Sequence, residues 1–151
     1  MSGICAFFGH RDTVITPQLE ERLTQTLRQL IDEGIDEFWC CEQGTFDWIC
    51  RVVILKLKKE FDFINVWYVC AYNPNKYSQI RQESLDRMFD GLIYNDKIAR
   101  GVPRFAILRR NRYIVQNADV IVCYVEHDYG GAYQTIELAK SYTKRILNLA
   151  A

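Results

Sequence analysis

The chain has 151 residues, 49% of them hydrophobic and 25% charged, which is the balance of a globular protein able to bury a core in one domain. Nineteen basic and nineteen acidic side chains cancel to zero net charge, which argues against a protein dominated by non-specific nucleic-acid binding. No apolar run approaches the roughly 20 residues of a membrane helix, and no export signal is evident.

The cysteines favour a reduced protein over a disulfide framework. Five of the six lie in apolar strand-like runs, namely Cys5, Cys40, Cys41, Cys70 and Cys123. The sixth, Cys50, lies in a helical stretch, and no two of them form a CxxC motif. Free cysteine packs as a small buried hydrophobe, so we predict a reducing, cytoplasmic setting. The chain has only two histidines, His10 and His127. A histidine-rich metal site is therefore not expected, and the sequence predicts no cofactor.

The first half of the chain alternates short apolar runs with segments of helical periodicity. Thr16 is suited to cap a helix that begins at Pro17, and Gly34 is suited to end it. The alternation predicts, in chain order, strand Ile4–Phe8, helix Pro17–Glu33, strand Phe38–Cys41, helix Phe46–Lys59 and strand Ile64–Ala71.

The second half resumes this pattern after a long interruption. Tyr72–Gly101 is too long for a simple connection and contains one short helical segment, Ser78–Phe89. Such an excursion at the carboxyl end of a strand often covers a ligand site. Beyond it the pattern predicts helix Pro103–Asn117, strand Asp119–Val125, helix Gly131–Thr143 and strand Arg145–Leu149.

Alternating strands and helices predict an α/β fold. We expect one Rossmann-like, doubly wound domain over residues 1–151, with a mainly parallel sheet of five strands. In such a sheet the strand-to-helix turns gather at one edge, where backbone N–H groups and helix N-termini can bind an anion.

Glycine-bearing turns follow three of the predicted strands. The residues they offer to a ligand are Gly9, His10 and Arg11, then Glu42, Gln43, Gly44 and Asp47, and finally Gly130, Gly131 and Ala132. Arg11 could form a bidentate contact with a phosphate. Glu42 and Asp47 could bind ribose hydroxyls, although Asp47 could equally favour the start of its helix through the helix dipole. A nucleotide-like small molecule is the first hypothesis.

The helix before the fourth strand contains four arginines, Arg104, Arg109, Arg110 and Arg112. On a helical projection Arg110 and Arg112 flank an apolar stripe and can reach towards a site, whereas Arg109 is expected to point into solvent. Asn111 falls within the stripe and would need hydrogen-bond partners there. The arginines could equally form a solvated face.

Several segments, taken in order, resemble the YpsA-like proteins of the SLOG superfamily, which is named for the Smf/DprA proteins and the LOG phosphoribohydrolases. They are Cys5–Arg11, Glu42–Asp47, Arg110–Arg112, Asp119–Val122 and Gly130–Ala132. The resemblance spans nearly the whole chain. It implies a Rossmann-like fold, a site for nucleotides or nucleotide-derived ligands, and a homodimer.

LOG enzymes cleave the N-glycosidic bond of nucleoside monophosphates with an arginine and with the glutamate of a PGGxGTxxE motif. By spacing, Arg110 and Glu137 match these two catalytic groups. The glycine pair here lacks the preceding proline, Tyr133 stands in place of the third glycine, and Thr135 comes one position late.

These observations support three hypotheses of different classes. The first is a domain that binds a nucleotide or an ADP-ribose-like metabolite as a sensor or sequestering module. The second is an N-glycosidase or deoxyribosyltransferase-like enzyme, in which Glu137 or Glu42 acts on an oxocarbenium-like transition state. The third is an association with single-stranded DNA, which would need a basic, aromatic groove and to which zero net charge gives little support.

Overall fold

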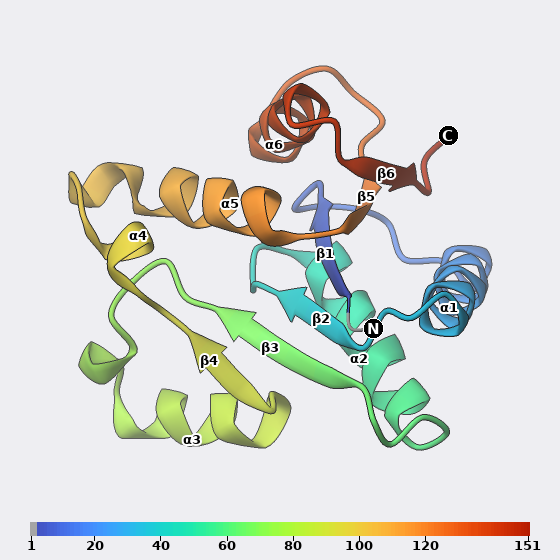
Figure 1. Ribbon diagram of the computed structural model, residues 1–151, viewed down its shortest axis with the longest axis horizontal. Coiled ribbons are helices and arrows are strands. Elements are labelled where there is room, and N and C mark those ends of the chain that lie inside the picture. Colours follow the sequence, from blue (N-terminus) through green and yellow to red (C-terminus); the bar gives the residue numbers. More distant parts are fainter. Residues whose placement is uncertain (1–2) are drawn as a thin grey trace.

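The computed structural model describes residues 3–151, and within them a sheet of six parallel strands forms the centre of the protein. The strand order is β4-β3-β2-β1-β5-β6, and every neighbouring pair is parallel (Figure 1). The strands are β1 Ile4–Gly9, β2 Glu37–Cys40, β3 Asn65–Val69, β4 Gly91–Ile93, β5 Val120–Tyr124 and β6 Arg145–Asn148.

Helices connect the strands and cover the sheet. The longest begins as the sequence predicts, because the Thr16 hydroxyl accepts a hydrogen bond from the Leu19 N–H at 3.1 Å and Pro17 occupies the first turn. The α-helices are α1 Pro17–Asp32, α2 Thr45–Lys58, α3 Gln79–Met88, α4 Asp96–Ala99, α5 Ala106–Asn117 and α6 Gly131–Ser141. Two short 3-10 helices, η1 and η2, cover Pro74–Lys76 and Pro103–Phe105.

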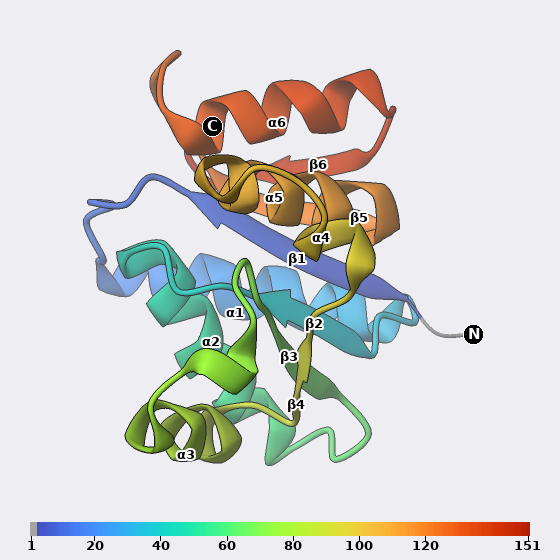
Figure 2. The same ribbon diagram turned by 90° about the vertical axis from the view of Figure 1, so that its left-hand side faces the viewer.

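The two faces of the sheet bury different helices. Cys5 and Phe7 of β1 pack into a core with side chains of α1, α2 and α3. Their neighbours Ala6 and Phe8 point to the opposite face, where they pack with side chains of α4, α5 and α6. Figure 2 shows α5 and α6 lying together at one end of the molecule and α3 at the other.

The order of the strands in the sheet changes direction at β1. From β1 the strands β2, β3 and β4 extend to one side, while β5 and β6 lie on the other. In open α/β sheets a crevice for ligands forms outside the carboxyl ends of the strands at such a switch point. The topology therefore places the β1–α1, β2–α2 and β5–α6 turns around one crevice.

The predicted fold class is confirmed, and the predicted strand count is wrong by one. The missed strand is β4, which lies inside the 72–101 excursion and pairs with β3 through Trp67 and Gly91. A Cβ on Gly91 would lie 2.2 Å from the Trp67 ring, so glycine is needed beneath the indole. Among residues 3–151 no helix is long and apolar enough to cross a membrane.

Candidate functional site

A cavity of about 410 Å³ opens at the switch point of the sheet. Its lining comes from the loops after β1, β2 and β5, the inner face of α5 and the first turn of α6. It brings together most of the predicted site residues, namely Gly9, His10, Arg11, Gln43, Asp47, Arg110, Gly130, Gly131 and Ala132. Three loops distant in sequence therefore meet at one rim.

Arg110 is the cationic side chain buried in this cavity. Only 1% of its surface is exposed, and its Nε donates a hydrogen bond to Asn111 Oδ1 at 2.9 Å. Asn111 Nδ2 in turn donates to the Thr135 hydroxyl on α6 at 3.3 Å. Arg110 Nη2 is buried without a hydrogen-bond partner, and Arg110 forms no ion pair within residues 3–151. A buried guanidinium that forms no ion pair is unfavourable, so an anion would complete this site.

The N-terminus of α6 faces the same cavity and adds positive potential. Gly130 is its N-cap residue with φ of 94°, and no side chain caps the first turn. A Cβ built on Gly130 or Gly131 would meet nothing within 4 Å, so the space above both residues is open. Free N–H groups and the helix dipole favour an anion at this position.

Asp47 is the buried carboxyl group of the cavity. It lies in the first turn of α2 and is 7% exposed. One oxygen, Oδ2, accepts a hydrogen bond from the Gln43 backbone N–H at 2.8 Å, whereas Oδ1 is buried without a partner. Burial raises the pKa of Asp47 from 3.8 to about 7, although the Gln43 hydrogen bond and the charge of Arg110 oppose this. Asp47 thus stabilises its own turn through Oδ2, and its second acceptor atom, Oδ1, has no hydrogen-bond partner.

His10 holds the loop that leads into α6. Its Nε2 accepts hydrogen bonds from the backbone N–H groups of Glu126, at 3.0 Å, and His127, at 3.4 Å. The ring is therefore the neutral tautomer protonated at Nδ1. Burial, reinforced by the neighbouring His127, lowers the pKa of His10. The His10 ring stacks on His127 at 3.4 Å, and His127 stacks on Tyr129 at 3.9 Å.

No family model and no curated protein matches the chain. Two solved structures of DNA processing protein A (DprA) match it over 95% of its length. The Helicobacter pylori structure, described for its single-stranded DNA binding mode, has a TM-score of 0.64 and 16% identity over 63% of its own chain. The Streptococcus pneumoniae structure has a TM-score of 0.66 and 14% identity over 49% of its own chain.

The chain is structurally similar to DprA. At 16% and 14% identity this likeness concerns the fold alone. Since the chain spans 63% and 49% of the two DprA chains, it corresponds to a part of each.

Five predicted site residues lie outside the lining of this cavity. Glu42 forms an ion pair with Arg81 at 3.3 Å, and Gly44 packs against the Arg11 backbone. The other three are exposed: Arg104 lies over the Phe105 ring, Arg112 points outward, and Glu137 pairs with Lys140 at 2.9 Å. Glu137 therefore has no place in the cavity lining, and its catalytic role stays a prediction from spacing.

Some lining residues were not predicted. His127 and Tyr129 come just before the glycine pair, and this position in the sequence could have indicated that they line the cavity. Asn111 and Thr135 come together only because α5 packs on α6, which the sequence does not indicate. The prediction that the Arg109 side chain points into solvent is wrong. Its Nε donates to the Ile98 carbonyl at 2.8 Å and its Nη1 donates to the Val102 carbonyl at 2.7 Å. Arg109 therefore holds the loop between α4 and α5.

The described residues form no cluster of metal ligands. Among residues 3–151, no group of three or more His, Cys, Asp or Glu side chains gathers as a metal site would need. All six cysteines are buried and free, and burial raises the pKa of each thiol. The cavity offers a ligand the buried Arg110 guanidinium, the buried Asp47 carboxyl group, the N-terminus of α6 and a rim that includes Arg11.

Proposed function

We propose that the chain binds a nucleotide or a nucleotide-derived ligand, such as an ADP-ribose-like molecule, as a sensor or sequestering module of the YpsA-like type. The observation that carries this proposal is the unpartnered Nη2 of Arg110, buried in a cavity that the N-terminus of α6 also faces. Together they suit a phosphate group. The free Oδ1 of Asp47 suits a sugar hydroxyl, which can donate a hydrogen bond to it.

The proposal is tested by calorimetric titration of the protein with AMP, GMP, NAD and ADP-ribose. We expect saturable binding of at least one, and Arg110→Met should weaken it roughly tenfold to 100-fold, because a charge-assisted hydrogen bond is lost. Methionine keeps much of the apolar volume and removes a buried charge, so the variant should still fold.

Arg112→Met is the matched control, since Arg112 lies exposed on the same helix. It removes the same charge and should bind as the wild type does. A single-stranded oligonucleotide belongs in the panel because the Helicobacter pylori structure concerns single-stranded DNA binding by that protein. Binding of the oligonucleotide alone, or of no phosphate-bearing ligand, would contradict the proposal.

A second candidate is hydrolysis of an N-glycosidic bond, and Asp47 is the observation that favours it. A carboxyl group with a pKa of about 7 can donate or accept a proton near neutral pH. Incubation with nucleoside monophosphates should then release free base, detected by chromatography, and Asp47→Asn should abolish the release. Glu137→Gln should leave it unchanged, because Glu137 lies outside the cavity lining. Saturable binding without release of base would exclude this candidate.

A further inference from the structure

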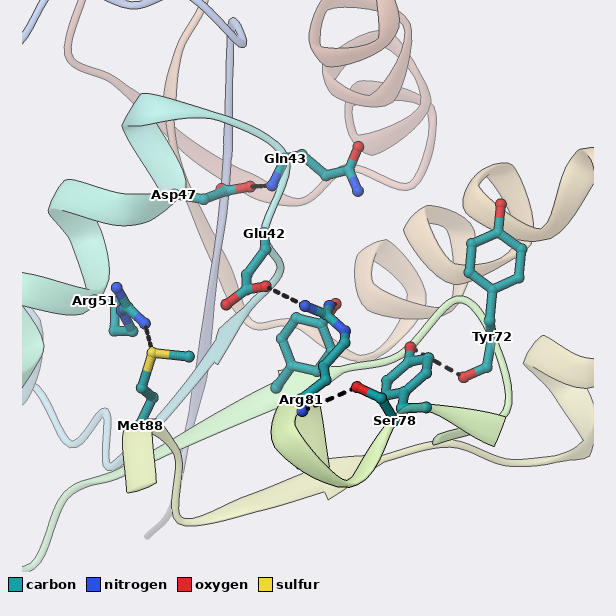
Figure 3. Close-up of polar contacts among 10 residues, drawn as sticks. Glu42, Gln43, Asp47, Arg51, Tyr72, Ser78, Arg81 and Met88 are labelled. Carbon is teal, nitrogen blue, oxygen red and sulfur yellow. Dashed lines mark hydrogen bonds and ion pairs between the residues drawn. The ribbon is translucent and has the colours of Figure 1, made fainter. Parts of the chain in front are cut away.

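A second cavity, of about 230 Å³, lies beside the first. Cys41 and Asp47 line both, so the two cavities are neighbours. The β2–α2 turn separates them, because Gln43 lines the first and Glu42 lines the second. Figure 3 shows these adjacent side chains pointing in different directions, with Glu42 towards Arg81.

The second cavity is small for a complete ligand. Ligand pockets commonly measure about 300–1,000 Å³, which is more than this cavity holds. Its volume suits one group of a ligand whose remainder lies elsewhere. The first cavity, with its unpartnered cation, is the adjoining place for that remainder.

The lining combines aromatic surface with hydrogen-bonding groups of both kinds. Trp48 is 50% exposed, while Phe89 is buried beneath the Arg51 guanidinium, which lies 5.9 Å from its ring centroid. Arg51 also contacts the sulfur of Met88 (Figure 3) and has no carboxylate partner among the described residues. Arg51 can therefore donate hydrogen bonds to a ligand.

The Glu42 carboxylate supplies the acceptors of this cavity. Its ion pair with Arg81 is 3.3 Å long, and the Arg81 guanidinium also lies 5.0 Å from the Tyr77 ring centroid. These contacts tie Glu42 to the first turn of α3, whose N-cap hydroxyl, on Ser78, accepts from the Arg81 N–H at 3.2 Å. An aromatic face with a nearby donor and acceptor is the chemistry that recognises a planar nitrogen heterocycle.

We infer that the second cavity binds the purine base of the ligand whose phosphate contacts Arg110. This inference rests on the proposed function and deepens it. The base stacks on Trp48, its ring acceptors face Arg51, and its N–H donors face Glu42. The sugar then lies at the shared wall, where Asp47 offers its free oxygen.

The test compares GMP and AMP with ribose 5-phosphate, which lacks the base. The wild type should bind the purine nucleotides at least tenfold more tightly than ribose 5-phosphate, because stacking and edge contacts add to the phosphate contact. Trp48→Ala and Arg51→Met should each remove most of this difference and leave the affinity for ribose 5-phosphate unchanged. Arg110→Met should lower the affinity for all three ligands, because each contains a phosphate group.

Phe63→Ala is the control, since Phe63 is another exposed aromatic side chain, 57% exposed, outside both cavity linings. Tryptophan fluorescence provides a second measurement: GMP should quench it, and Trp48→Phe should bind GMP with less than a tenfold loss and without that quenching. Equal affinity for ribose 5-phosphate and the nucleotides would overturn the inference while the proposed function stands. If GMP, AMP and ribose 5-phosphate all fail to bind, the inference is overturned, and the proposed function is overturned with it when NAD and ADP-ribose also fail to bind.

Discussion

Replacing Gly44 with alanine should lower the free energy of unfolding by about 3 kcal/mol, measured by urea denaturation. Gly44 has φ of 144°, in a region that L side chains rarely adopt. Its added Cβ would lie 2.5 Å from both Cα and the carbonyl oxygen of Arg11. Because both atoms are backbone, relief requires moving the β1–α1 loop.

That movement would also break the contacts that fix the loop to α2. The Thr45 backbone N–H donates to the Arg11 carbonyl at 3.0 Å, and the Thr45 hydroxyl donates to the Thr13 carbonyl at 2.5 Å. Arg11 lines the cavity at this point. We therefore expect Gly44→Ala to weaken ligand binding as well, although Gly44 is not in the lining of that cavity.

Gly131→Ala is the informative control for the glycine argument. A Cβ added to Gly131 would meet nothing within 4 Å, and Gly131 has no positive φ. The stability of this variant should therefore equal or slightly exceed that of the wild type, since alanine is favoured over glycine in a helix. The added methyl group enters the cavity, so ligand affinity should fall. A Gly44→Ala variant within about 1 kcal/mol of the wild type would show that the Arg11 loop yields readily.

Much of the fold could be predicted from the order of apolar runs and glycine turns. Parallel strands covered on both faces have continuous apolar sequences, and β1, β3 and β5 fit this description. β4 does not, because it has three residues, all partly buried, and depends on Trp67 packing over Gly91. A contact between residues far apart in the chain leaves no periodic signal in the sequence.

The turns of the site and several of its charged residues could be predicted, but the burial of those charged side chains could not. Loops at the carboxyl ends of strands must share one edge, so the positions of Gly9 and Gly130 followed from the topology. The burial of Arg110 did not follow, because it depends on how α5 packs against the sheet and α6, and contacts between residues far apart in the chain leave no local pattern in the sequence. Spacing to a known motif selected Glu137, whereas burial singles out Asp47 as the carboxyl group of the cavity.

Asp47→Asn should make the protein more stable at pH 8, by about 2 kcal/mol in urea denaturation. The raised pKa of Asp47, about 7 against 3.8, means that its charge costs about 4 kcal/mol in the folded state at ~1.4 kcal/mol per pKa unit. Asparagine carries no charge, and its carbonyl oxygen can still accept the Gln43 N–H. Its amide N–H₂ has no partner, which offsets part of the gain.

The stability difference between Asp47→Asn and the wild type should depend on pH, because the pKa of Asp47 is higher in the folded than in the unfolded chain. Below pH 3.8 both the folded and the unfolded wild type bind the Asp47 proton, so the carboxyl group contributes no penalty. Between 3.8 and about 7 the unfolded chain releases the proton while the folded chain retains it, so stability falls as pH rises. Above about 7 the penalty is constant. The advantage of Asp47→Asn should therefore grow between about pH 4 and pH 8.

The same substitution should lower the affinity for the proposed ligand. The carboxylate oxygen can accept a hydrogen bond from a sugar hydroxyl, whereas the amide N–H₂ group that replaces it cannot accept one. A variant that gains stability and loses affinity is the combination expected where a buried group serves binding. Asp62→Asn, at an exposed aspartate, should change neither quantity. A stability difference between wild type and Asp47→Asn that stays constant from pH 4 to pH 8 would show that Asp47 titrates normally, and its assignment to the ligand site would lose its electrostatic basis.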